Sequence, residues 1–163
     1  MFMELNPSKI IYGPYVETWC QMSYPNHPNG CGNYLKNPDC PPLTKPYNHL
    51  ISPPYYVGVL EFNIRQWIED MQEKHPKMSE LQCRIPYLWQ SKQDKILEAG
   101  LREFAKDVGL PGLRILTRPE KYYVNIFSTC RLHGIKIDRD PKDVVTLVGM
   151  MGKNRFSAAE YFE

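Results

Sequence analysis

Three of the chain's five cysteines lie close together in the sequence, at Cys20, Cys31 and Cys40. Cysteine thiolates are ligands for zinc and for iron–sulfur clusters. The spacing differs from the close Cys-x-x-Cys pairs of zinc ribbons and bacterial ferredoxins, but the Pro and Gly residues between the cysteines let the chain fold back. Cys40 precedes Pro41 and Pro42, similar to the Cys-Pro that ends ferredoxin ligand runs. We therefore expect these cysteines to converge on one metal centre.

Two kinds of metal centre are compatible with three cysteines. A structural zinc site requires four protein ligands, and His27 is the candidate for the fourth. A [4Fe-4S] cluster held by three cysteines leaves one iron open to a substrate, which is a reactive arrangement. Trp19, Tyr24 and Tyr34 would shield such a cluster from water. The alternative to both is three separate buried thiols, because free cysteine packs as a small apolar residue.

The other two cysteines, Cys83 and Cys130, fall in patterns typical of helices. Buried cysteines are common in protein cores, so we expect both to be core residues. Either one would have to join the centre if the protein were an electron-transfer protein with a fully ligated cluster.

The composition is that of a folded domain. The chain has 163 residues, 42% hydrophobic and 23% charged, with a net charge of +2. This small excess of positive charge is no strong signal for nucleic acid. No apolar run approaches the roughly 18 residues of a membrane span, and the first residues lack a signal-peptide pattern, so we expect a cytoplasmic protein. Stable disulfides are rare in that compartment. The oligomeric state is not indicated.

The sequence predicts a single domain with three parts. Ten of the fifteen prolines lie in residues 1–54, which we interpret as an irregular, Cys/Pro-rich metal-binding arm. Residues 55–151 form an α/β body, and residues 152–163 form a tail. Within the arm, Ser8–Tyr12 could form one short strand.

The body alternates strand and helix patterns. Apolar, β-branched segments predict strands at 55–62, 112–117 and 143–151. Asn63 is expected to cap a helix, Ser79 and Gln82 form a capping-box pattern, and Pro86 restarts the following helix. Another helix should run from Asn125 to His133. This order favours a small α/β sandwich with a partly parallel, three- to four-stranded sheet and helices packed on it.

Several polar residues could serve a reaction near the metal. In a parallel sheet, ligands bind beyond the carboxyl ends of the strands, where we expect Arg118 and Asn125. The catalytic candidates are Arg118, Asn125 and Arg84. Further residues that could line a pocket are Asn33, Gln90, Lys92 and Thr129. The structural alternative for Asn125 is a helix cap, and for Lys92 a solvated surface position.

Two groups of motifs resemble a known family. They are Gly-Cys-Gly-Asn-Tyr at 30–34 with Cys-Pro-Pro at 40–42, and Arg-Pro-Glu at 118–120 with Val-Asn-Ile-Phe-Ser-Thr at 124–129 and Gly-Ile at 134–135. They are similar to the pattern of an uncharacterised family of predicted metal-binding proteins, a domain of unknown function typical of anaerobic prokaryotes. The resemblance implies one metal centre at the three cysteines and no established reaction. Many members carry a second, late cysteine cluster, of which this chain has only Cys130.

These observations lead to one functional expectation with two alternatives. We expect a metal-binding protein with a three-cysteine [4Fe-4S] cluster and one open iron, used in non-redox chemistry. An example is removal of sulfur from a small thio-compound or thiolated nucleobase, by an iron–sulfur-dependent desulfidase or lyase. The first alternative is a non-catalytic binding module stapled by zinc through the cysteines and His27. The second is a redox or electron-transfer iron–sulfur protein.

Overall fold

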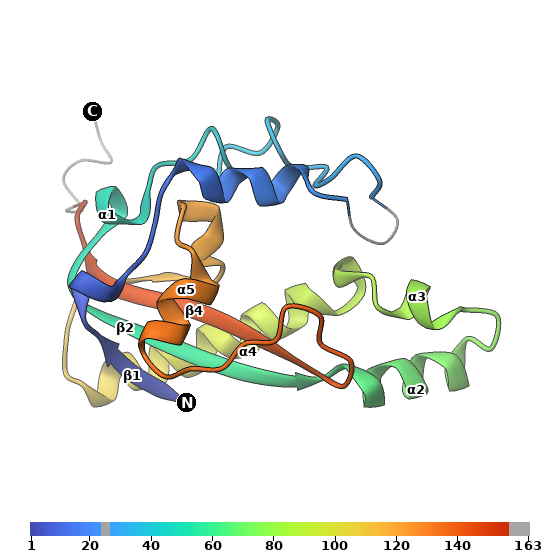
Figure 1. Ribbon diagram of the computed structural model, residues 1–163. Helices are drawn as coiled ribbons and strands as arrows, with labels where there is room; N and C mark the ends of the chain where they lie inside the picture. Colours follow the sequence, from blue (N-terminus) through green and yellow to red (C-terminus); the bar gives the residue numbers. More distant parts are fainter. Residues whose placement is uncertain (24–26, 157–163) are drawn as a thin grey trace.

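The computed structural model describes residues 1–23 and 27–156. A four-stranded sheet in the order β1-β2-β4-β3 forms the middle layer. Its strands are β1 (Phe2–Leu5), β2 (Ile51–Asn63), β3 (Leu113–Leu116) and β4 (Val144–Asn154). The α-helices are α1 (Tyr47–Leu50), α2 (Ile64–Lys74), α3 (Glu80–Cys83), α4 (Pro86–Asp107) and α5 (Ile126–Leu132). The 3₁₀ helices are η1 (Pro7–Lys9), η2 (Pro14–Gln21) and η3 (Pro119–Tyr122). Figure 1 shows their arrangement.

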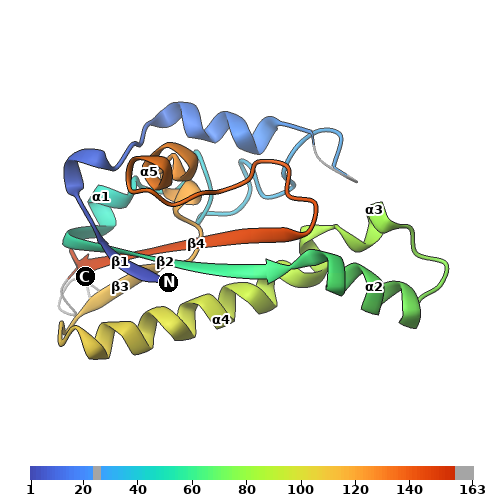
Figure 2. The same cartoon turned by 60° about the horizontal axis from the view of Figure 1, so that its bottom comes forward.

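Helical segments cover both faces of this sheet. Figure 2 shows α4 along one face and α5 with the N-terminal arm on the other. The period of two along a strand explains this division, because neighbouring side chains point to opposite faces. Val57 and Met150 belong to the core under α5. Tyr56 and Met151 belong to the core under α2 and α4. The expected α/β architecture with helices packed on a sheet is therefore confirmed.

Two facing glycines let α4 approach the centre of the sheet. Gly58 of β2 pairs with Gly149 of β4. A Cβ atom on either one would lie within 2.8 Å of a methyl carbon of Leu101, which is fully buried. The close approach of helix and sheet thus depends on the missing side chains at these two positions.

The expectation of a partly parallel sheet is wrong, because all three strand pairings are antiparallel. β2 and β3 are joined through α2, α3 and α4, as in a parallel crossover, but they are not neighbours. β4 lies between them and pairs with both. This is a split β-α-β arrangement, in which a late strand occupies the position between the two earlier ones. The rule that ligands lie beyond the carboxyl ends of parallel strands therefore does not apply.

The N-terminal arm is more regular than the prolines suggested. Phe2–Leu5 forms an edge strand on β2. Ser8–Tyr12 does not form the expected strand, because Pro7–Lys9 is a 3₁₀ helix and Tyr12 makes only an isolated bridge to Val124. After η2 the arm crosses above α5, as Figure 1 shows. The predicted tail begins inside β4, which extends to Asn154, and its residues 157–163 lie outside the described part of the chain.

The predicted helix boundaries agree well with the structure. The Asn63 side chain caps α2, and Ser79 and Gln82 form the capping box of α3. Pro86 begins α4. Asn125 caps α5, and Gly134 follows that helix with a φ of +76°. Within the described residues, no helix is long and apolar enough to cross a membrane.

Candidate metal centre

Cys20, Cys31 and Cys40 line one cavity of about 310 Å³. Its walls come from three parts of the chain: the arm, the first turns of α4, and η3 with the residue before it. Trp19 and Tyr34, two of the three aromatic residues expected to shield the site, also line this cavity. The third, Tyr24, lies outside the described residues. The tertiary fold therefore brings together the three cysteines that the sequence grouped.

A direct backbone contact joins Cys20 to Cys31. Cys20 lies at the end of η2, and the Cys31 amide donates a hydrogen bond of 2.7 Å to its carbonyl oxygen. The chain returns to this point through Gly30, whose φ is +83°. A Cβ at Gly30 would lie 2.4 Å from the same carbonyl oxygen. Only glycine fits both the left-handed conformation and the close approach.

Cys40 is held by turns on both sides. Its amide donates to the Asn37 carbonyl at 3.0 Å, and its own carbonyl accepts from the amides of Leu43 and Thr44. With 5% of its surface exposed it is buried, whereas Cys20 and Cys31 are partly exposed. Of the three cysteines that line the cavity, Cys40 is therefore the least accessible to solvent.

The surroundings of Cys20 and Cys40 disfavour the charged form of these two thiols. Burial, followed by the neighbouring cysteines and Glu120, raises the pKa of Cys20 to about 11. Burial also raises the pKa of Cys40, whereas the positive charges of Lys121 and Arg118 act to lower it. A metal binds the thiolate, so binding has to displace these protons.

Among residues 1–23 and 27–156, no group of three or more His, Cys, Asp or Glu side chains is arranged to hold a metal ion. His27, the candidate fourth ligand, lines a neighbouring cavity of about 470 Å³. That cavity shares Cys31, Asn33, Gln90 and Arg118 with the cysteine cavity. The two therefore form a continuous depression between the arm and the start of α4.

Arg118 is the catalytic candidate that the fold brings to the cysteines. Its guanidinium forms an ion pair with Asp94 of α4, and Nε donates to the Asp94 carboxylate at 2.6 Å. Asn33 and Gln90, two of the other polar candidates, lie beside it. Sequence reasoning missed Glu120 and Lys121, which line the same cavity. Burial raises the pKa of the Glu120 carboxyl.

The remaining polar candidates have structural partners elsewhere. Arg84 donates to the Pro141 and Lys142 carbonyls at 3.2 and 2.8 Å, which ties α3 to the segment before β4. Asn125 caps α5 by accepting from the Ser128 amide at 2.9 Å. Neither of these two lines the cysteine cavity.

Two further candidates and the other cysteines also lie outside the cavity lining. The Thr129 hydroxyl accepts from the Ile11 amide at 3.0 Å, and Lys92 is exposed on α4. Cys83 and Cys130 are buried in the two hydrophobic cores, as expected for core cysteines. Burial raises the pKa of the Cys130 thiol to about 11.

No protein family model, curated protein or solved structure matches this chain.

Proposed function

We propose that Cys20, Cys31 and Cys40 bind a [4Fe-4S] cluster with one open iron site. The observation that supports this most directly is that the three cysteines of the arm line a single cavity. Binding requires the three thiols to lose their protons and to turn toward one centre. The resemblance to predicted metal-binding proteins in the same cysteines supports the same proposal.

The size and charge of the cavity favour a cluster over a single ion. Zinc binds its ligands at about 2.0–2.3 Å and fills little space. A cavity of about 310 Å³ accommodates a larger inorganic group. A cluster held by thiolates is negatively charged, and Lys121 lines the same cavity with positive charge. His27 lines the neighbouring cavity, which favours a three-cysteine centre over one that includes His27.

The polar residues beside the cysteines suggest a use for the open site. A cluster with one iron not ligated by protein supplies a Lewis acid that can accept sulfur from a small thio-compound or thiolated nucleobase. Gln90 and Asn33 can hydrogen-bond the polar edge of such a substrate. Arg118 can orient an electron-rich group of it. Replacement of the sulfur by the oxygen of water releases sulfide and needs no net electrons, so the reaction is non-redox.

Anaerobic reconstitution with iron and sulfide tests the cluster. We expect a brown protein that contains about four iron and four sulfide per chain, because that is the composition of the cluster. Cys31→Ala should lose the colour and most of the iron. Cys130→Ala removes a buried thiol outside the cavity and should keep both. A colourless protein with one zinc per chain would overturn the proposal.

The same experiment separates the two alternatives. For a zinc staple, His27→Ala should release the metal and unfold the arm, whereas a three-cysteine cluster should survive this substitution. For an electron-transfer protein, replacing Cys83 and Cys130 together should destroy the cluster. The burial of both residues in the hydrophobic cores argues against that role. Release of sulfide from a thiolated nucleobase such as 4-thiouracil then tests the reaction itself.

A further inference from the structure

A second cavity lies on the other side of α5, between this helix and the segment that follows it. Its volume is about 760 Å³, within the range of small-molecule sites. Arg131 of α5 and Lys136 and Arg139 of the following segment line it. The lining also includes the hydroxyl residue Ser128 and one carboxylate, Asp138. Three cations from two segments thus surround one depression, in a chain with a net charge of only +2.

The cations of this cavity are not neutralised by the protein around them. In the part of the chain that the structure describes, none of the ion pairs includes Arg131, Lys136 or Arg139. The Asp138 carboxylate accepts a hydrogen bond from the Asp140 amide at 2.9 Å. Elsewhere on the surface basic side chains do pair: Lys142, for example, binds Asp140. The cavity therefore keeps an excess of positive charge available to a ligand.

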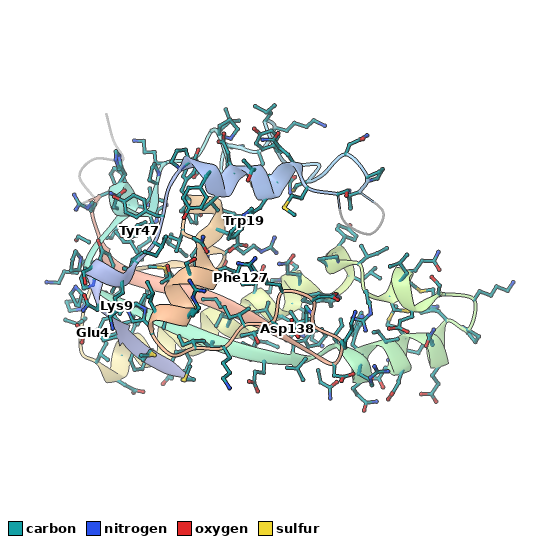
Figure 3. The ribbon with its side chains drawn as sticks, viewed as in Figure 1. Glu4, Lys9, Trp19, Tyr47, Phe127 and Asp138 are labelled. Carbon is teal, nitrogen blue, oxygen red and sulfur yellow. The ribbon has the colours of Figure 1, made fainter. Side chains whose placement is uncertain are left out.

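Aromatic and aliphatic side chains form the rest of the cavity. The Arg139 guanidinium lies 4.9 Å from the centre of the Phe127 ring. The Phe127 ring also contacts Trp19, with 5.5 Å between the ring centres and an angle of 63° between the ring planes. In the view of Figure 3, Trp19 of η2, Phe127 of α5 and Asp138 follow one another from top to bottom. Ile135 and Ile137 also line the cavity. A ligand here would meet apolar surface beside the cations.

We propose that this cavity binds a small molecule carrying a phosphate group next to a flat or apolar portion, such as a nucleoside monophosphate. Arginine side chains bind phosphate oxygens through two parallel hydrogen bonds, and lysine adds a positive charge. Ser128 supplies a hydroxyl donor, and the half-buried Ile137 supplies apolar surface for the organic part. The site is separate from the cysteine cavity, with Trp19 and Phe127 between the two.

Titration calorimetry with AMP, inorganic pyrophosphate and citrate at constant ionic strength tests this proposal. We expect AMP and pyrophosphate to bind more tightly than citrate, and AMP affinity to fall as salt is raised. The double variant Arg131→Gln/Lys136→Gln should raise the Kd for AMP at least tenfold. Both residues are exposed, and circular dichroism will verify that the variant is folded.

Two controls make the result specific. Arg102→Gln/Lys106→Gln removes the same charges from α4, where both side chains are exposed, and should leave AMP binding unchanged. Metal-free and reconstituted wild-type protein should bind AMP equally, so the result does not depend on the metal proposal. The inference would be overturned if AMP did not bind, or if citrate bound as tightly as AMP or more tightly. It would also be overturned if either control lost more AMP affinity than Arg131→Gln/Lys136→Gln.

Discussion

Alanine at position 30 should open the contact between Cys20 and Cys31 without disturbing the rest of the fold. Gly30 is buried, has a φ of +83°, and its ideal Cβ would lie 2.4 Å from the Cys20 carbonyl oxygen. That oxygen belongs to the backbone and accepts the 2.7 Å hydrogen bond from Cys31. Alanine therefore cannot be accommodated by a side-chain rotation, and the two backbone segments have to separate.

The cost follows from two contributions. The left-handed backbone conformation is about 1–2 kcal/mol less favourable than the right-handed one for a residue with a Cβ. Loss of the Cys31–Cys20 hydrogen bond adds about 1 kcal/mol. A local destabilisation of about 2–3 kcal/mol corresponds to a roughly 30- to 150-fold larger population of the open state.

Amide hydrogen exchange of the metal-free protein measures this effect directly. The Cys31 amide of Gly30→Ala should exchange at least about 30-fold faster than in the wild type, because exchange follows the population of the open state. The amides of β2 and β4 should keep their protection. In the reconstituted protein the same variant should retain less iron, because the backbone segments that carry Cys20 and Cys31 have separated.

Gly32→Ala is the matched control. Gly32 is exposed, lies two residues further along the same segment, and has no atom within 4 Å of its ideal Cβ position. This variant should exchange at the wild-type rate. Equal exchange at Cys31 in the two variants, or an unprotected Cys31 amide in the wild type, would refute the reasoning.

Three other changes have expected outcomes. Gly149→Ala should lower the free energy of unfolding in urea by about 1–3 kcal/mol, because its Cβ would lie 2.7 Å from Leu101 Cδ1. The destabilisation caused by Gly149→Ala should be smaller in a Leu101→Ala background, because the clashing methyl group is then absent. Arg118→Gln should lower the free energy of unfolding by about 1–3 kcal/mol, because it leaves the 14% exposed Asp94 carboxylate without its ion pair. Stability should also fall as pH rises from 9 to 11. The pKa of folded Cys130 is raised to about 11, so the folded state keeps a proton that the unfolded chain loses first.

Each of these predictions has a control. The Leu101→Ala background tests the glycine prediction, and an undiminished cost there would contradict it. For Arg118, the control is Arg102→Gln, whose ion pair with Glu98 is 66% and 37% exposed and should contribute less than about 1 kcal/mol. For the pH effect, the free energy of unfolding should fall less between pH 9 and 11 in Cys130→Ala than in the wild type. The difference should be up to about 2–3 kcal/mol, the equivalent of two pKa units. An unchanged pH slope in that variant would show that Cys130 does not cause the loss.

Local signals in the sequence were sufficient for most elements. Asn63, Ser79 and Asn125 stand where helices begin, because their side chains satisfy amides of the first turn. Such contacts span three residues and can be read from a single segment. The strands of the body were also recognisable, because β2 and β4 carry long apolar patterns.

The sheet topology could not be read in the same way. A strand, a helix pair and another strand predict parallel neighbours only if no other strand lies between them. Here β4, far along the chain, pairs with both β2 and β3. The strand pattern of 143–151 contains no signal for its position in the sheet, because that position depends on long-range pairing. The placement of functional residues at parallel strand ends failed for the same reason.

The sequence by itself determined which cysteines to consider together, and the metal they bind stays a prediction. Residue type and the turn-forming residues between Cys20, Cys31 and Cys40 were enough for that grouping. Only the tertiary structure decided what surrounds them: Glu120 and Lys121 from η3, Gln90 from α4, and Arg118 held by Asp94. Packing joins segments up to about a hundred residues apart, which no local pattern encodes. The basic cavity beside α5 differs in this respect, because all of its lining residues lie within residues 127–139.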